Sequence, residues 1–193
     1  AAEFINGRPN DNIGITLFAG ETFTQCPLTV DHAVLLDMIH NIKCGLITDG
    51  TAVGMGIANA VTRLKDSKAK SKVIILLTDG TNNKGDISPM TAAEIAKSFG
   101  IRVYTIGVGT NGMAPYPYPV GNTVQYVSMP VEIDEKTLTE IAGTTDGNYF
   151  RATSNSKLKE VYEEIDKLEK TKLNVKEYSK RDEEYQWFAL AAF

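Results

Sequence analysis

The tetrapeptide Thr-Asp-Gly-Thr occurs twice in the chain, at 48–51 and at 78–81. The second copy follows the aliphatic run 73–77, so Asp79 is expected where a buried strand ends. A carboxylate beside such a strand is costly unless a cation, a partner or backbone amides offset its charge. Thr51 precedes a helical pattern, and hydroxyl and carboxylate oxygens together suit Mg²⁺. Taken singly, Asp79 is better explained as a turn residue and Thr51 as a helix cap, but their order and spacing together favour a cation site.

Three stretches of the sequence match part of an enzyme motif, and each lacks a residue or an element that the chemistry requires. Residues 107–112 match GxGxxG, but prolines follow in place of the helix that a dinucleotide site requires. The strand ending in Asp79 is typical of nucleotide hydrolases, yet the chain has no GxxxxGK[ST] loop. An aspartate phosphatase needs a nucleophilic carboxylate two residues before the Asp of the Asp-Gly-Thr sequence. Ile47 and Leu77 stand at those positions here. The chain is therefore predicted not to be an enzyme, and Mg²⁺-dependent hydrolysis of phosphate esters stays as the alternative.

Composition favours a single globular domain. The 193 residues are 42% hydrophobic and 23% charged, and the net charge of -4 gives no basic surface for nucleic acid. Cys26 and Cys44 match no zinc spacing and are predicted to be separate, buried thiols. His32 and His40 are predicted to be solvated surface residues and not a metal or catalytic pair.

The elements that position these residues alternate along the chain. Strands are expected at 12–19, 22–28, 72–78, 102–108 and 148–151, by their aliphatic runs and flanking turn residues. Helices are expected before Gly7, after Asp31, from 50–51, from a capping box at 91–94, after Asp134, and over 158–168. The segment 110–130, rich in proline and tyrosine, is expected to form a hairpin or a binding loop.

This alternation predicts an α/β fold, namely a doubly wound, mostly parallel sheet with helices on both faces and one antiparallel edge hairpin strand. Ligands of such sheets bind at the carboxyl ends of the strands, which is where Asp79 lies. Residues 1–170 are expected to form the domain. Residues 171–193 are expected to be a juxtamembrane linker and the start of a transmembrane helix, because a charged run leads into WFALAAF.

The order of the motifs resembles a von Willebrand factor A (VWA) domain. The resemblance is carried by NIGITLFAG, GLITDGTAVGMGIANAV, KVIILLTDGTNN and RVYTIGVGT. Within that family the chain is most similar to the membrane-anchored proteins of bacterial aerotolerance (Bat) operons, of the BatA/BatB type. That narrower resemblance is carried by QCPLTVD, PYPYP, VEIDEKTLTEIAGTTDGNYFRAT and VYEEIDKLEKT.

The resemblance implies a metal-ion-dependent adhesion site (MIDAS) built from three loops. Thr51 matches the threonine of the second loop and Asp79 the aspartate of the third, and the implied ion is Mg²⁺ or Mn²⁺. The DxSxS motif of the first loop is not in the sequence. The first central strand is therefore expected to be missing from this chain, and the site to be partial and weakly occupied or empty. Asp49, next to Thr51, is not expected to be a ligand.

The resemblance also implies a function, that of a metal-ion-dependent protein–protein interaction module in a membrane-anchored bacterial protein of aerotolerance or stress. The domain is expected on the periplasmic side of the cytoplasmic membrane, tethered through anchors outside this chain. Expected partners are a protein offering an acidic side chain, other Bat-type membrane proteins and a MoxR-type AAA+ ATPase assembly. The position of the final helix is expected to report partner binding to the membrane. A metal-independent scaffold with a vestigial site is the other alternative.

Overall fold

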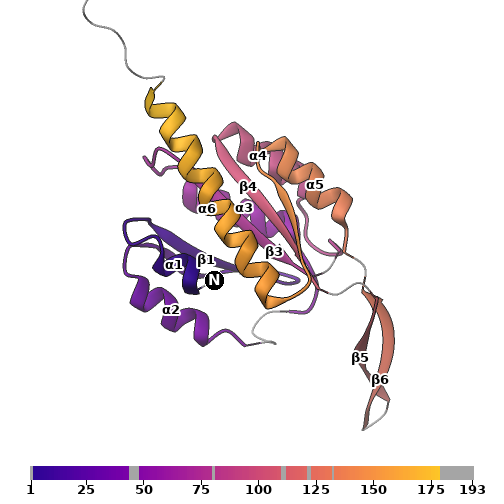
Figure 1. Cartoon of the computed structure of the whole chain (residues 1–193). Helices are drawn as coiled ribbons and strands as arrows, with labels where there is room; N and C mark the ends of the chain where they lie inside the picture. Colours follow the sequence, from indigo (N-terminus) through magenta and orange to yellow (C-terminus); the bar gives the residue numbers. More distant parts are fainter. Residues whose placement is uncertain are drawn as a thin grey trace, which may run out of the picture.

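The computed structural model describes residues 2–43, 48–79, 81–109, 112–120, 123–131 and 133–178 (Figure 1). Helices and strands follow one another largely as the sequence predicts. The helices are α1 (Ala2–Asn6), α2 (His32–His40), α3 (Val53–Leu64), α4 (Pro89–Ser98), α5 (Glu135–Thr144) and α6 (Asn155–Tyr178). The strands are β1 (Ile13–Phe18), β2 (Thr22–Thr29), β3 (Lys72–Thr78), β4 (Ile101–Val108), β5 (Gly112–Val120), β6 (Thr123–Val131) and β7 (Tyr149–Ala152).

The strands form one parallel sheet and two antiparallel hairpins. In the sheet the order is β3-β4-β7, and β3 pairs with β4 from Lys72↔Ile101 to Thr78↔Gly107. The carboxyl ends of these strands therefore share one edge. Within the described residues, β1 pairs with β2 only, and β3 pairs with β4 only. Parallel strands, antiparallel hairpins and flanking helices confirm the predicted α/β class.

Helices cover both faces of the parallel sheet (Figure 1). Ile74 and Leu76 of β3 pack in one core with α3, α4 and α5. The alternate residues of β3, at 73, 75 and 77, pack on the other face in the core beneath α6, which contributes Val161 and Ile165. Side chains of a strand alternate between its faces, so the unbroken aliphatic run serves two cores at once.

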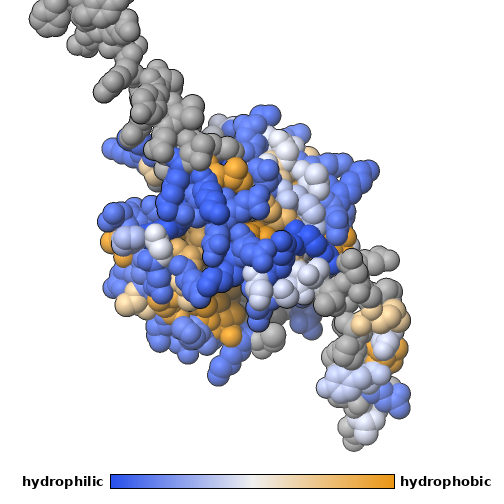
Figure 2. Space-filling model, in the orientation of Figure 1, coloured by the Kyte–Doolittle hydropathy of each residue, from blue (hydrophilic) through white to orange (hydrophobic). Residues whose placement is uncertain are grey.

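A smaller core lies between the β1–β2 hairpin and helices α1 and α2. It is built around Ile5, Cys26 and Leu35. Hydrophobic residues also reach the surface here, over α1 and α2 at the lower left of Figure 2, and Val34 of α2 is exposed. Cys26 is a buried free thiol, as predicted. Cys44 lies outside the described residues.

The segment of prolines and tyrosines forms the hairpin β5–β6, one of its two predicted alternatives. The hairpin projects from the layered body at the end of β4 (Figure 1). Because β4 runs parallel to β3, the hairpin leaves the body at the edge where β3 also ends.

Helix caps confirm two predictions and correct a third. Asp31 accepts a hydrogen bond from the Val34 amide at 3.1 Å, and Asp134 accepts one from the Thr137 amide at 3.0 Å. The expected capping box at 91–94 is wrong, because α4 begins at Pro89 with Ser88 as its N-cap. Proline at the first helical position lacks only an N–H that would have no helical partner there, and Ser88 caps the turn that follows.

The last helix is longer than its apolar stripe. α6 continues to Tyr178, so the expected boundary between 170 and 171 falls within a helix and not at its end. Within the described residues, no helix is long and apolar enough to cross a membrane.

Candidate functional site

Asp79 follows directly on the last residue of β3, at the carboxyl edge of the sheet. Thr78, the residue before it, is buried and only 6% exposed. The Asp79 side chain is exposed. The end of β3 thus presents a carboxylate to solvent at the position where ligands of doubly wound sheets bind.

Thr51 lies on the loop 48–52, which is held against the end of β1. The amide of Ala52 donates to the carbonyl of Ala19 at 2.7 Å, and the amide of Gly20 donates to the carbonyl of Thr48 at 2.7 Å. A Cβ on Gly20 would come within 2.7 Å of the Asp49 carbonyl oxygen. Glycine is therefore required at 20 for the loop to lie this close to the strand.

Two asparagines join the loop of Thr51 to the loop that follows Asp79. The Asn83 side-chain oxygen accepts from the Thr51 amide at 2.9 Å, and the Asn82 side-chain oxygen accepts from the Val53 amide at 2.9 Å. The amide of Asn83 in turn donates to the Thr51 carbonyl at 3.0 Å. Asn82 thereby caps α3 from outside, because Ala52 at the N-cap has no side-chain oxygen of its own.

The oxygen donors of Thr51 and Asp79 are of the type that binds a hard cation. Asp79 offers a carboxylate, and Thr51, which bonds to Asn83 through its backbone amide and carbonyl, offers a hydroxyl oxygen. Mg²⁺ accepts a few protein oxygens and keeps several waters. Two donors are a partial set, and no group of three or more His, Cys, Asp or Glu side chains that could hold a metal lies within the described ranges. When bound there, an ion would supply positive charge for an incoming carboxylate.

The two histidines lie away from this edge, on α2. His32 approaches the carbonyl of Asp11 at 3.0 Å with Nε2, and His40 approaches the carbonyl of Leu36 at 2.7 Å with Nδ1. Both rings therefore contact backbone oxygens near α2.

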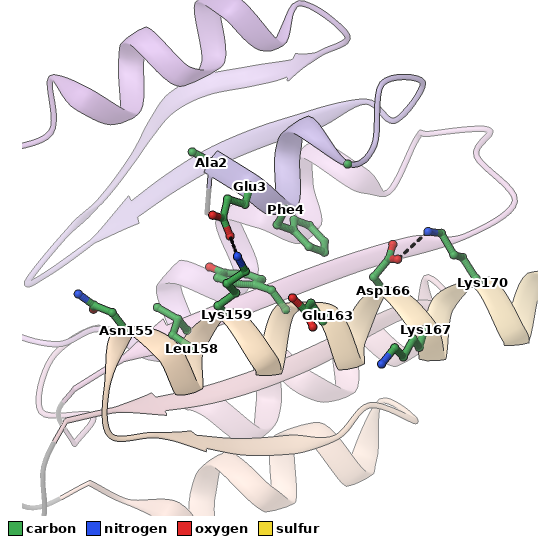
Figure 3. A pocket seen from close by; sticks show the side chains of 12 residues that line it. Ala2, Glu3, Phe4, Asn155, Leu158, Lys159, Glu163, Asp166, Lys167 and Lys170 are labelled. Atoms are coloured by element: carbon green, nitrogen blue, oxygen red, sulfur yellow. Dashed lines mark hydrogen bonds and ion pairs between the residues drawn. The ribbon is translucent and has the colours of Figure 1, made fainter.

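A groove of about 860 Å³ lies between α1 and α6 and contains neither Thr51 nor Asp79 (Figure 3). Lys159 crosses it to pair with Glu3 at 2.9 Å, and the rings of Phe4 and Tyr162 are 5.1 Å apart. Asp166, farther along α6, pairs with Arg8 at 2.8 Å. These contacts hold α1 on α6, so the groove is read as a packing seam of the fold.

A buried ion pair fixes α6 at the opposite edge of the sheet. Glu169, 3% exposed, binds Arg102 at the start of β4 and accepts hydrogen bonds from Tyr104 at 2.7 Å and Ser71 at 2.9 Å. Burial alone would raise the pKa of Glu169, but these hydrogen bonds and the Arg102 charge outweigh it and lower that pKa. Burial, followed by the Glu169 carboxylate, raises the pKa of Tyr104.

This network was not predicted from the sequence. Glu169 stands in the run KLEKTK, which is typical of a solvated helix face. A signal does exist in the position of Glu169. It lies four residues after Ile165 and eight after Val161, on the same face of α6 as these two core residues.

The structure is that of an α/β domain with helices on both faces of a parallel sheet, a class of fold in which ligands bind at the carboxyl edge. Comparison with family models places this chain more closely. Residues 1–164 match the model of the von Willebrand factor type A domain, and the chain belongs to that family. The chain spans about half the length of the curated relatives it matches.

Two solved bacterial proteins share the fold over most of both chains. BatB from Bacteroides thetaiotaomicron is 32% identical, with a TM-score of 0.73, 88% of this chain covered and 84% of that one. An aerotolerance-related membrane protein from Bacteroides fragilis is 28% identical, with a TM-score of 0.71 and coverage of 86% and 82%. The chain is thus a VWA domain similar to Bat-type, aerotolerance-related proteins.

A third solved structure shows a metal in the family's site. Proximal thread matrix protein 1 from the mussel byssus, described with a zinc-occupied MIDAS motif, is 25% identical, with a TM-score of 0.64. The match covers 86% of this chain and 38% of that one. A VWA fold similar to this one therefore holds a divalent cation in that protein.

Proposed function

We propose that this domain is a binding module that holds a divalent cation with Thr51 and Asp79 and uses it to capture an acidic side chain of a partner protein. The observation that carries the proposal is the pair of asparagines, Asn82 and Asn83, which bond the two donor-bearing loops to each other. Loops that are tied together in this way are preorganised, so less conformational entropy is lost when an ion binds.

Mg²⁺ or Mn²⁺ is the proposed ion, because a carboxylate and a hydroxyl are hard oxygen donors. Asp79 is exposed, which leaves room for water and for a partner's carboxylate beside the ion. The role of Asn82 and Asn83 is to position the loops, since their side chains are already engaged by the backbone of 51–53.

The proposed setting is a bacterial cell envelope, with the domain on the periplasmic side of the cytoplasmic membrane and its partners among other Bat-type membrane proteins and a MoxR-type AAA+ ATPase assembly. Similarity to BatB and to the aerotolerance-related membrane protein of Bacteroides supports this setting. The partner's contribution is defined by its chemistry, an exposed Asp or Glu that completes the coordination of the ion.

The test is titration of the protein with Mn²⁺, followed by electron paramagnetic resonance of the free ion. Asp79→Asn and Thr51→Ala are expected to weaken binding at least about tenfold, about 1.4 kcal/mol each. Asp66→Asn is the matched control, because it removes the same charge from an exposed residue just after α3, remote from the Thr51 loop. Asp49→Asn tests whether the neighbouring acid is a ligand, and no change is expected.

The alternatives give different results in the same experiments. Binding of Mn²⁺ that is the same in the Asp79 and Asp66 variants would refute the proposed site. Partner association that persists with a chelator would indicate a metal-independent scaffold. Release of phosphate from ester substrates that requires Asp79 would indicate a hydrolase, whereas we propose that the domain is not an enzyme.

A further inference from the structure

The hairpin β5–β6 carries no charged residue from 112 to 131, although it projects from the body of the protein (Figures 1 and 2). Several of its large side chains are exposed: Met113 is 63% exposed, Tyr126 72% and Val127 47%. A two-stranded hairpin is only marginally stable alone in water, so a partner that pairs with it would stabilise it.

The pairing of the hairpin makes its two outer edges unlike. Residues of an antiparallel pair alternate between those that bond to the opposite strand and those whose N–H and C=O point outward. The prolines of β5 stand at 115, 117 and 119, paired with Ser128, Tyr126 and Val124. A proline has no N–H to donate, so these three pairs are the ones that do not bond across the hairpin.

It follows that the outer edge of β5 has no N–H at 115, 117 or 119. The outer edge of β6 has N–H and C=O groups at Val124, Tyr126 and Ser128, and within the described residues β6 pairs with β5 only. Proline on an edge is a device against strand addition, and β5 has three prolines on its edge over 115–119, whereas the edge of β6 has none over 124–128 and one, Pro130, beyond that stretch. Over 124–128 the hairpin therefore offers a pairing edge along β6, while the facing stretch of β5 is blocked.

We propose that a second copy of this chain occupies the open edge, with β6 pairing antiparallel to β6 about a two-fold axis at Tyr126. In that register Tyr126 faces Tyr126 of the second copy and Val124 faces Ser128, so each outward amide finds an outward carbonyl. The result is a four-stranded sheet that resists further strand addition, because both of its outer edges are β5 strands that lack an N–H at 115, 117 and 119. This proposal is independent of the metal site.

Charge and shape favour a like copy as the occupant. The chain has a net charge of -4, but the uncharged hairpins would meet without like-charge repulsion. The hairpin stands clear of the layers in Figure 1, so two bodies can approach through their hairpins alone. A contact confined to the edges of two hairpins is expected to bury less than the roughly 800 Å² per partner of a stable interface. We therefore expect a weak dimer whose population rises with concentration.

The test is sedimentation equilibrium of the 193-residue chain over a range of concentrations. Ser128→Pro removes an outward N–H without removing a hydrogen bond inside the hairpin, and is expected to weaken dimerisation at least tenfold. Ser128→Ala keeps that N–H and is the matched control, expected to stay within twofold of the original chain. Far-ultraviolet circular dichroism of both variants checks that the fold is kept.

Disulfide trapping tests the register. Tyr126→Cys places two thiols opposite each other on the axis, where the Cα separation of about 5.5 Å in a bonded pair permits a disulfide. Ser128→Cys does not face itself in this register. Oxidised dimer is therefore expected from the first variant and not from the second, above the background of the unsubstituted chain.

Three results would overturn the proposal. The first is a chain that stays monomeric at millimolar concentration. The second is a dimer that Ser128→Pro and Ser128→Ala affect equally. The third is a monomer that binds phosphatidylglycerol vesicles and loses that binding in Tyr126→Ser, because the hairpin would then be a membrane contact.

Discussion

Replacing Glu169 by alanine is the sharpest test of what holds α6 to the sheet. The substitution deletes the carboxylate that pairs with Arg102 and accepts hydrogen bonds from Tyr104 and Ser71. The Tyr104 side chain is fully buried, so its hydroxyl would lose a partner that water cannot readily replace. The Arg102 guanidinium would be left without its counter-charge.

The expected loss can be estimated from the burial of the two charges. Removing one partner of a buried ion pair costs about 3 to 5 kcal/mol. The side chain of Glu169 is 4% exposed and that of Arg102 is 16% exposed, so solvent can reach part of the guanidinium. We therefore expect the lower end, about 3 kcal/mol. For a domain of this size that corresponds to a melting temperature lower by about 6 to 12 °C.

The assay is urea unfolding followed by far-ultraviolet circular dichroism, with Glu164→Ala as the matched control. Glu164 is an exposed residue of the same helix, so its replacement is expected to change the free energy of unfolding by less than about 0.5 kcal/mol. A loss of less than about 1 kcal/mol for Glu169→Ala would refute the argument that this network is a tight buried pair.

The pH dependence gives an independent check with a defined sign. The pKa of Glu169 is lower in the folded protein, so its stabilisation is full above the ordinary glutamate pKa of about 4.3. It is lost as the pH falls below that value through the lowered pKa. The difference in stability between the original chain and Glu169→Ala should therefore shrink below about pH 4. A difference that grows with acid would contradict this assignment.

Two further predictions concern a close backbone contact and a buried hydrogen bond. Gly54→Ala places a Cβ 2.1 Å from the Ile87 carbonyl oxygen and is expected to destabilise the protein by more than about 2 kcal/mol. The control is Gly143→Ala, whose Cβ meets nothing within 4 Å and which is expected to be neutral or to stabilise the protein by up to about 1 kcal/mol. Equal effects in thermal unfolding would contradict this. Thr145→Val leaves the buried Val103 amide without its acceptor at 3.0 Å, and a loss of about 1 to 3 kcal/mol is expected in urea unfolding; no loss would contradict it.

Much of the fold could be predicted because local chemistry and burial agree. The run 73–77 predicts a strand buried on both faces, and Asp31 and Asp134 predict helix starts that the structure contains. The start of α4 was predicted wrongly because Thr91 and Glu94 have capping-box spacing, while Ser88 and Pro89 give a start one turn earlier. Two overlapping cap signals are not resolved by spacing alone.

The candidate site could be predicted less completely, because its supports are long-range. Thr51 and Asp79 are identifiable from their motifs, but Asn82 and Asn83 look like ordinary turn residues. Their bonds to residues about 30 positions earlier exist only once α3 and β3 lie side by side. The same limit applies to Glu169, whose partners lie 67 and 98 residues earlier.

The Glu169 network also bears on the expectation that α6 moves when a partner binds. The candidate site and this network lie at opposite edges of the sheet. Because Glu169 of α6 pairs with Arg102 of β4, moving α6 along its axis would break the buried pair. A ligand shifts an equilibrium only by its differential affinity for the two states. A penalty of about 3 kcal/mol requires binding on the order of 10²-fold tighter to the shifted state.

We therefore expect Mn²⁺ alone to leave hydrogen exchange over 158–169 unchanged. An ion bound at Thr51 and Asp79 would not contact α6, so it would not bind more tightly to a state in which α6 has moved. In Glu169→Ala, where the penalty is removed, the same helix is expected to exchange faster with or without the ion. Exchange that rises on adding Mn²⁺ to the original chain would mean that the buried pair does not hold α6 in place.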